Sequence, residues 1–417
     1  MEEMIFASQQ GRNIPKEDKI FGINNRAKAM IAKEGKEKVV NATIGALLDD
    51  DGELIVLSSV SDVFKNLKPK EFAEYAPISG TPEFREAVKK DALRGYEPKG
   101  FVEASATPGG TGAIRNTIAN FSDRGDAVLV ADWYWSPYST IASEQGRRVE
   151  TFTFFNEKRK FNAEDFKSEA VALLAHQERL VIILNTPAHN PTGYSLTQED
   201  WNNVKEVLGS LPPEKKITLL VDVAYIDFAG DEDEYRAFLP ILEEMPENVL
   251  PLISHSLSKA YTLYGMRCGA LICMAKTKEI AEEFKRVCEF SSRASWSNCA
   301  RAPQMILSKI YSDPSLKERV FEERQGYREM LLRRGKAFEE AAAACGLEMV
   351  PFDAGFFASI PCDNPDETAA RLESEGIFLV PLAKGLRVSI ASVSEEVCRR
   401  LPERILSAMR GCGLVKL

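Results

Sequence analysis

Residues 256–269 read SLSKAYTLYGMRCG, a segment that places Lys259 among serines and Arg267 shortly before a glycine. A lysine amine that reacts with carbonyl groups needs a desolvated or cation-rich pocket, which keeps part of it unprotonated near neutral pH. A phosphate group beside that amine needs hydroxyl donors and a forked arginine. The segment supplies both parts. Taken alone, it would also fit a surface lysine next to a structural arginine.

Two upstream segments place polar side chains at the ends of apolar runs. Residues 180–184 and 217–221 are continuously apolar, which is typical of parallel strands buried on both faces. Asn190 lies in an Asn-Pro-Thr-Gly turn soon after the first run, and Asp222 directly follows the second, with Tyr225 three residues further on. Side chains at the carboxyl ends of such strands face the ligand crevice of an α/β sheet. In isolation, the turn that contains Asn190 would be ordinary loop chemistry, and Asp222 would be an aspartate that caps the following segment.

A glycine-rich loop and an aromatic cluster are further candidates for binding a ligand. The sequence PGGTG at 108–112 precedes apolar residues at helical spacing, so backbone N–H groups at the start of a helix could bind an anion. A tight turn would explain these glycines equally well. The strand predicted at 127–131 leads to Trp133, Tyr134 and Trp135. Aromatic rings at that position can stack on a planar ligand.

Together these motifs resemble those of the fold-type I pyridoxal-phosphate-dependent aminotransferases of class I/II, in the same order and with similar gaps. The resemblance runs from about Asn41 to about Ser389 and is strongest to the aspartate and aromatic aminotransferases. It implies an α/β fold with a large, mostly parallel sheet domain and a small α/β domain. Residues 1–60 would form an N-terminal arm and part of the small domain, 61–325 the large cofactor-binding domain, and 326–417 the rest of the small domain.

The resemblance also implies roles for cofactor-binding residues. Lys259 would bind pyridoxal 5'-phosphate covalently and then act as a base, while Asp222 would keep the cofactor ring nitrogen protonated. Asn190 and Tyr225 would contact the phenolate oxygen. Trp135 would stack on the ring, with Trp133 as the alternative. The phosphate would be held by Gly110, Thr111, Ser256 and Arg267, with Tyr75 arriving from a neighbouring subunit. Many family members have serine where this chain has Gly109, so one phosphate hydrogen bond is expected to be missing.

Substrate-binding residues follow from the same resemblance. Gly45 would lie over the substrate carboxylate, and Arg387 would pair with the α-carboxylate. Arg293 stands four residues before Ser-Asn, as does the arginine that binds dicarboxylates across the subunit interface of the aspartate and aromatic enzymes. Arg301 is an alternative for that role. The implied activity is transfer of an amino group between an amino acid and a 2-oxo acid, with glutamate or aspartate as one partner, in a homodimer with shared active sites.

Other functions on the same scaffold stay open from sequence. A pyridoxal-phosphate-dependent lyase that performs β- or γ-elimination would use much of the same site, and the products of a half-reaction would distinguish it. A regulatory or binding protein is a further alternative. The presence of Lys259, Asp222 and Arg387 together speaks against it, and so does the lack of an added DNA-binding region.

The composition limits the partners, bound metals and cellular location that we expect. The chain has 417 residues, 44% of them hydrophobic and 28% charged, with a formal net charge of −9 and no basic stripe, so nucleic acid is not an expected partner. No apolar run is long enough for a membrane span, and the N-terminus lacks the pattern of a signal peptide. All eight cysteines lie at Cys268 or later without Cys-x-x-Cys spacing, and there are only three histidines. We therefore expect neither disulfides nor a metal site, and a cytoplasmic location.

The periodicity of apolar residues predicts further elements. Helices are expected near 23–33, 83–90, 276–290, 365–375 and 395–410, and a long helix from about 313 to 344 is expected to link the two domains. Strands are expected near 39–45, 268–274, 356–360, 378–380 and 386–390.

Overall fold

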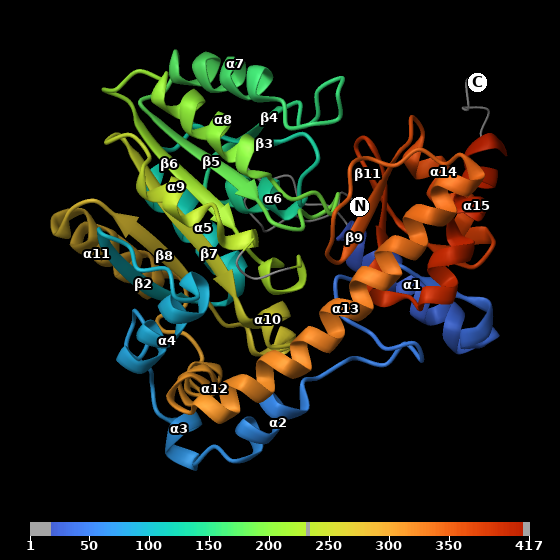
Figure 1. The fold of residues 1–417 in the computed structure, drawn as a ribbon, viewed down its shortest axis with the longest axis horizontal. Helices are drawn as coiled ribbons and strands as arrows, with labels where there is room; N and C mark the ends of the chain where they lie inside the picture. Colours follow the sequence, from blue (N-terminus) through green and yellow to red (C-terminus); the bar gives the residue numbers. More distant parts are fainter. Residues whose placement is uncertain (1–17, 231–233, 412–417) are drawn as a thin grey trace, which may run out of the picture.

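The centre of the computed structural model, which describes residues 18–230 and 234–411, is a seven-stranded sheet. Its strands, in spatial order, are β2 (Phe101–Thr107), β8 (Gly269–Ala275), β7 (Val249–Ser256), β6 (Lys216–Asp222), β5 (Arg179–Asn185), β3 (Ala127–Ala131) and β4 (Arg148–Phe152). Every neighbouring pair is parallel except those that β8 makes with β2 and β7. Figure 1 shows helices on both sides of this sheet. The predicted α/β architecture is therefore confirmed.

Alternate residues of the central strands enter two different cores. Val128 and Val130 pack in one buried cluster, whereas Leu129 between them packs in the other. This period of two is that of a strand covered on both faces, which explains the continuous apolar runs in the sequence. One face is covered by α5 (Gly109–Phe121), α6 (Pro137–Glu144) and α11 (Lys278–Ser295). The other is covered by α4 (Pro82–Leu93), α7 (Ala163–Leu174), α8 (Gln198–Gly209), α9 (Leu239–Glu243) and α12 (Arg301–Ser312).

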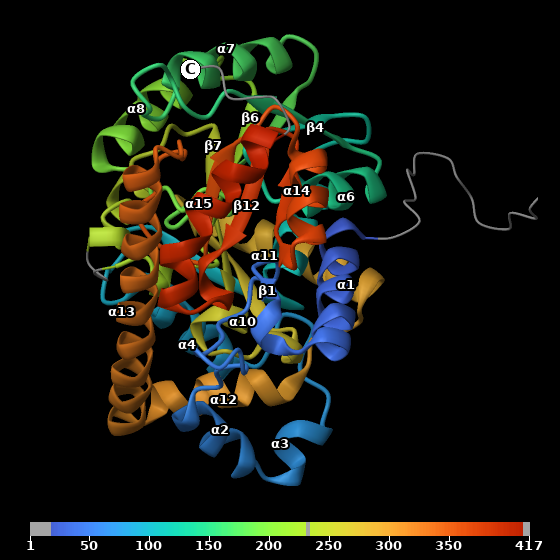
Figure 2. The same cartoon turned by 90° about the vertical axis from the view of Figure 1, so that its right-hand side faces the viewer.

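A smaller unit combines both ends of the described chain. It contains the antiparallel sheet β11 (Val380–Leu382), β12 (Gly385–Ser389) and β9 (Phe357–Pro361), and the parallel pair β1 (Val40–Asn41) and β10 (Ile377–Phe378). Around them lie α1 (Lys19–Glu34), α14 (Pro365–Ser374) and α15 (Glu395–Gly411). Figure 2 shows α1 next to the C-terminal elements. The smaller unit has its own buried cluster, separate from those of the large sheet, which includes Leu386 and Val388 of β12.

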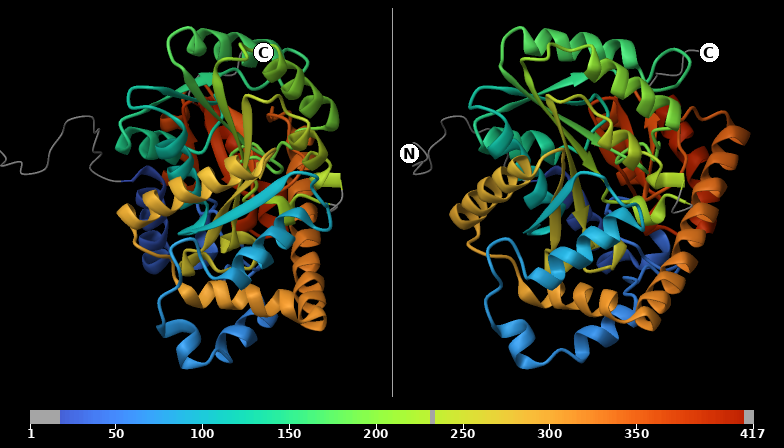
Figure 3. Two further views of the ribbon diagram at one scale, coloured as in Figure 1. Left: turned by 90° about the vertical axis from the view of Figure 1, so that its left-hand side faces the viewer. Right: turned by 60° about the vertical axis from the view of Figure 1, so that its left-hand side comes forward.

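A single long helix, α13 (Pro314–Cys345), runs from the large unit into the small one. The carboxylate of Asp313 accepts hydrogen bonds from the first free N–H groups, and Gly346 ends the helix with φ of +79°. Figures 1 and 3 show α13 starting beside α12 and extending to the small unit. Two short helices, α2 (Ser58–Lys65) and α3 (Pro69–Ala73), lie near its start.

Most predicted elements are confirmed, with three differences. The strand expected at 378–380 is divided between β10 and β11, which pair in different sheets. The run expected at 39–45 is a strand only at Val40–Asn41, after which its backbone bonds to the segment around Ser389. Strands β2, β4 and β7 and helices α2, α3, α6, α7, α8, α9 and α12 were not predicted. Residues 1–17 of the expected N-terminal arm lie outside the described residues. Among the helices of residues 18–230 and 234–411, none has the length and apolarity to cross a membrane.

Candidate active site

Lys259 lies where the carboxyl ends of the central strands converge. It belongs to α10 (Leu257–Ala260), the short helix that directly follows β7. Its Nζ is 5.7 Å from the ring centre of Tyr225 and 5.5 Å from that of Tyr264. Burial lowers the pKa of the Lys259 amine to about 8, and the positive charges of Arg267 and Arg387 act in the same direction. Part of the amine is therefore unprotonated near neutral pH.

Asp222 ends β6 in a buried position with a hydrogen-bonded carboxylate. The hydroxyl of Tyr138 donates to its Oδ2 at 2.7 Å. Burial raises the pKa of Asp222 to about 6, although the bonds from Tyr138 and the backbone of Ala224 act in the opposite direction. A buried carboxylate with a raised pKa lacks a full counter-charge, and a protonated ring nitrogen would provide one. Tyr138 is the second residue of α6, and no role was assigned to it from sequence.

Asn190, Tyr225 and Arg387 form a connected group beside the lysine. Asn190 Nδ2 donates to Tyr225 Oη at 3.4 Å, and Arg387 Nη1 donates to Asn190 Oδ1 at 3.3 Å. Burial raises the pKa of Tyr225 well above its usual value, so the residue carries a neutral phenol that can donate a hydrogen bond. The structure thus brings together two residues that were predicted to contact one oxygen of the cofactor.

Arg387 lies on β12, where neighbouring groups fix its guanidinium. Its Nη2 donates to the carbonyl of Thr43 at 2.7 Å, its guanidinium carbon lies 4.3 Å from the ring centre of Phe357, and its Nε has no hydrogen-bond partner among the described residues. Burial lowers the pKa of Arg387 to about 10, which leaves it charged at neutral pH. A Cβ on Gly45 would come within 2.7 Å of Phe357, so glycine is required for this close packing.

The glycine-rich loop packs directly against the segment that contains Arg267. Gly109 has φ of +70°, and a Cβ there would lie 2.6 Å from Arg267 Nη2. The arginine occupies the space that a serine side chain would need, which explains why the loop begins with glycine. A Cβ on Gly110 would lie 3.3 Å from the hydroxyl of Ser254, which has no hydrogen-bond partner in the described part of the chain.

A phosphate group fits this cradle. The N-terminus of α5, a 13-residue helix, starts at the loop with its free backbone N–H groups. Arg267 donates to the hydroxyl of Ser258 at 3.1 Å, and Ser256 caps α10 by accepting from Ser258 N at 3.2 Å. Hydroxyls, a guanidinium and a helix N-terminus are therefore assembled around one position, as phosphate binding requires.

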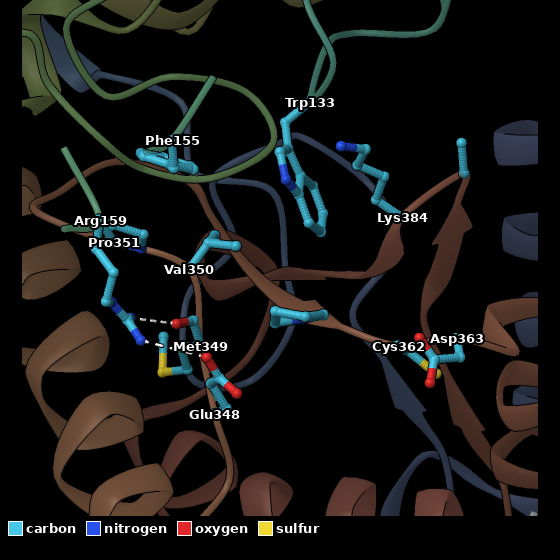
Figure 4. A pocket seen from close by; sticks show the side chains of 12 residues that line it. Trp133, Phe155, Arg159, Glu348, Met349, Val350, Pro351, Cys362, Asp363 and Lys384 are labelled. Atoms are coloured by element: carbon cyan, nitrogen blue, oxygen red, sulfur yellow. Dashed lines mark hydrogen bonds and ion pairs between the residues drawn. The ribbon is translucent and has the colours of Figure 1, made fainter. Parts of the chain in front are cut away.

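The two candidate tryptophans point into different surroundings. Trp135 makes an edge-to-face contact with Tyr138 (5.5 Å between ring centres), and Tyr138 is bonded to Asp222. Trp133 instead lines a pocket of about 510 Å³ between the large and small units, together with Arg159 and Lys384 (Figure 4). This arrangement favours Trp135 as the ring that stacks on a ligand near Asp222.

Tyr75 and Arg293 lie on the surface of the chain. The Tyr75 side chain is 86% exposed, and exposed Arg293 donates to Ser297 Oγ at 2.6 Å. Arg301, the alternative, is engaged within the chain. Its Nη2 lies 3.2 Å from Glu74 Oε2, and its Nη1 donates to the carbonyl of Tyr75 at 3.3 Å. Arg301 therefore holds the Tyr75 segment, and Arg293 is the arginine that can reach another molecule.

Sequence and structure comparisons identify the class of protein. Residues 37–405 match the family model described as aminotransferase class I and II. The chain is 30% identical over 326 residues to the mitochondrial aspartate aminotransferase of Schizosaccharomyces pombe (77% of this chain, 72% of the relative). It is 26% identical over 403 residues to the aromatic-amino-acid aminotransferase of Paracoccus denitrificans (93% and 96%).

Solved structures agree with these relatives. An aminotransferase from Anaerococcus prevotii is 39% identical, with a TM-score of 0.94, and the match covers 97% of this chain and 100% of that one. An aromatic-amino-acid aminotransferase from Burkholderia pseudomallei, covalently bound to pyridoxal phosphate, shares the fold at 22% identity and a TM-score of 0.79, covering 97% and 100%.

The chain belongs to the class I and II aminotransferases. It is a pyridoxal-phosphate-dependent enzyme of the fold-type I architecture, which moves an amino group between an amino acid and a 2-oxo acid. The family, fold, activity and cofactor predicted from sequence are thereby confirmed.

Proposed function

We propose that Lys259, Asp222 and Arg387 carry the reaction in this chain. Pyridoxal phosphate, when bound, supplies the electron sink that makes the substrate Cα–H acidic. Lys259 would hold the cofactor covalently, and its Nζ would then take the proton from the substrate α-carbon. The pKa of about 8 supports this role, because an amine that titrates near neutral pH can serve both as nucleophile and as base.

Asp222 would pair with the ring nitrogen, and Tyr138 would orient its carboxylate. Asn190 and Tyr225 would donate to the phenolate oxygen, and Trp135 would cover the ring. The hydrogen bonds of Tyr138 to Asp222 and of Asn190 to Tyr225 support these assignments. The phosphate would be held by Gly110, Thr111, Ser256 and Arg267, with Tyr75 from a second copy of the chain.

Arg387 would bind the α-carboxylate of every substrate. Its Nε is available, while Thr43 and Asn190 hold the rest of the guanidinium in place. Gly45 would allow the substrate to approach beside Phe357. A carboxylate fixed in this way orients the Cα–H bond for proton removal rather than for decarboxylation.

We infer that the substrate pair includes a dicarboxylic acid, such as glutamate or aspartate, bound by Arg293 of a neighbouring subunit. The observation that carries this inference is the contrast between exposed Arg293 and engaged Arg301. Exposed Tyr75 and the aromatic Phe290, 78% exposed and one turn before Arg293 on α11, support a homodimer with shared sites. The free cysteines of the described chain, all buried except Cys345, support a reducing, cytoplasmic location.

Mixed dimers test the shared site. Lys259→Ala chains and Arg293→Leu chains would be co-expressed with different tags, and the mixed dimer isolated. One of its two sites would combine Lys259 from one chain with Arg293 from the other, so activity with glutamate should return to about half the wild-type value. If Arg293 served its own chain, every site that keeps Lys259 would lack the arginine, and activity with glutamate would stay low.

The substrate pair itself is tested by product analysis. Purified enzyme would be mixed with single amino acids and either 2-oxoglutarate or oxaloacetate, and the amino acids and oxo acids formed would be identified. Formation of glutamate or aspartate supports the proposal. Ammonia with an unsaturated or rearranged product would instead identify an elimination enzyme.

A further inference from the structure

Two arginines on α13 are buried in the protein interior although neither was predicted to have a function. Arg324 and Arg334 are each 1% exposed and stand ten residues apart, about 15 Å along a helix. A buried guanidinium destabilises the fold unless it is hydrogen-bonded and paired. The groups that each arginine contacts therefore show what it holds in place.

Arg324 contacts the segments that carry Lys259 and Tyr225. Its Nη1 donates to the carbonyl oxygen of Ala260, the residue after Lys259, at 3.3 Å. The same nitrogen lies 3.4 Å from Oδ2 of Asp227, two residues after Tyr225. Its guanidinium is also 5.6 Å from the ring centre of Tyr261. Figure 1 shows α13 passing α10, where this contact is made.

A buried ion cluster extends the same support to the end of β7. The cluster joins Asp227 to Arg94 (2.9 Å) and Arg236 (3.1 Å), and Asp91 to Arg94 (3.1 Å) and His255 (2.8 Å). His255 immediately precedes Ser256 of the phosphate cradle. Although burial opposes it, the neighbouring Arg94 and His255 hold the pKa of Asp91 well below its usual range. Arg324 is thus one member of a charged unit that lies behind the cofactor-binding segments.

Arg334 contacts the other half of the site. Its Nη1 donates to the carbonyls of Leu48 (2.9 Å) and Ala391 (3.2 Å), and its Nη2 pairs with Asp50 at 2.7 Å. Leu48 lies three residues after Gly45, and Ala391 lies four after Arg387. Leu48 N also donates to the Ala391 carbonyl at 2.9 Å, so Arg334 joins the two backbones that carry the substrate-binding residues.

We propose that α13 is a strut behind the active site, on which Arg324 positions the Lys259 segment and Arg334 positions the Gly45 and Arg387 segments. Both arginines would act through the segments that they contact, so both are positioning residues. Because their partners differ, loss of Arg324 impairs proton transfer and loss of Arg334 impairs substrate binding. The inference rests on the roles proposed above for Lys259 and Arg387.

The test compares Arg324→Met with Arg334→Met, each variant serving as the control for the other. Both substitutions remove a buried guanidinium from the same helix and leave a side chain of similar length. In single-turnover half-reactions of the holoenzyme with glutamate, Arg324→Met should lower the limiting rate about tenfold and leave the apparent substrate Kd within about threefold. Arg334→Met should raise the apparent Kd about tenfold and leave the limiting rate within about threefold.

Hydrogen exchange of the full-length protein gives a readout that does not depend on activity. Arg324→Met should speed exchange in peptides covering 257–264, and Arg334→Met in those covering 44–50 and 387–392. Uniformly faster exchange, with both kinetic constants changed alike in both variants, would overturn the proposal. If a Met variant does not fold, the corresponding Lys variant keeps the charge. The Lys variant should show the same selective pattern with smaller changes in rate or apparent Kd. Failure to show that pattern would equally overturn the proposal.

A failure of the proposed function is recognised separately. If wild-type protein does not transfer an amino group, the roles of Lys259 and Arg387 are wrong whatever the variants do. If the wild type is active and the variants show no selective pattern, only the strut is wrong.

Discussion

The proposed active site has two regions of opposite character, a buried wall and an exposed rim. The wall consists of Lys259, Asp222 and Arg387, whose polar neighbours come from the same chain. The rim consists of Tyr75 and Arg293, which lie in solvent. Both regions contain an arginine suited to a carboxylate, but Arg387 is fixed on three sides whereas Arg293 donates, among the described residues, only to Ser297, in the turn after its own helix.

This difference separates chemistry from specificity. Every amino acid has an α-carboxylate and an α-hydrogen, so the residues that act on them can be fixed once within the fold. The distal carboxylate differs between substrates, and under the proposal the arginine that serves it would come from a second chain, so it would be free to change without disturbing the wall. Substitutions in the wall should therefore affect all substrates, and those in the rim only some.

The largest effect is expected for Lys259→Ala. Without the amine there is neither a covalent bond to the cofactor nor a base at the α-carbon, so multiple-turnover transamination should be lost for acidic and neutral substrates alike. The absorbance of the bound cofactor and mass spectrometry after borohydride reduction measure the bond. Lys167→Ala, at an exposed position on α7, is the control and should behave as wild type. A borohydride-reducible bond retained in Lys259→Ala would show that another lysine holds the cofactor.

Asp222→Asn should lower the turnover rate by about 10²–10³, because the ring nitrogen loses its buried counter-charge. The loss should be similar for every amino acid, and larger than any loss of cofactor affinity. Rates with glutamate and with a neutral amino acid, together with cofactor titration, provide the measurement. A rate within about threefold of wild type would remove Asp222 from the mechanism.

The same substitution should stabilise the protein without cofactor. Burial raises the pKa of Asp222 to about 6, so the folded state binds more protons than the unfolded state between about pH 4 and 6. The stability contributed by this group is present below that range and is lost as pH rises through it. At pH 8, Asp222→Asn should therefore raise the free energy of unfolding by about 1–3 kcal/mol, and at pH 4 it should change it little. Urea titrations at both pH values check the sign.

Arg293→Leu should act on the rim alone. The Michaelis constant for glutamate or aspartate should rise about tenfold, equivalent to about 1.4 kcal/mol, because two charge-assisted hydrogen bonds to the distal carboxylate are lost. Neutral substrates should be nearly unaffected. Arg301→Leu is the control, since it releases the Tyr75 segment and should weaken both substrate classes. Equal losses for acidic and neutral substrates in Arg293→Leu would mark Arg293 as structural.

Asp222 of the wall and its neighbour Asn190 could be placed from sequence because they follow recognisable strands, whereas Lys259 and Arg387 were assigned from the resemblance to the family. Asn190 and Asp222 come after apolar runs, and the structure brings them together at one edge of the sheet. Strand β7 was missed because it contains Pro251, and proline argues against a central strand. In the structure Pro251 nevertheless lies opposite Leu219 of β6. The buried ion cluster was missed for a different reason. Its charged residues come from segments far apart in the chain and look like surface residues until tertiary packing buries them.

Tyr138 is a single residue whose role likewise could not be predicted without the tertiary structure. It follows Pro137 near the start of α6, where an aromatic residue is most simply a core residue, and only the fold reveals that its hydroxyl reaches Asp222.

The smallest effect is expected for Tyr138→Phe, which tests whether the wall depends on its own supporting residues. The hydrogen bond from Tyr138 lowers the pKa of Asp222, so its removal should raise that pKa further. Because the charged carboxylate is the form that pairs with a protonated ring nitrogen, the acidic limb of the kcat/KM profile should move to higher pH. Well above that limb Asp222 stays ionised without Tyr138, so the rate should fall by less than about tenfold, equivalent to about 1.4 kcal/mol. Tyr134→Phe is the matched control. Its hydroxyl bonds Ser139 at 2.8 Å, its ring stacks on Tyr138 at 6.5 Å, and its removal should leave the pH profile unchanged. If the two variants have the same profile as wild type, Asp222 does not depend on Tyr138, and the raised pKa reflects burial alone.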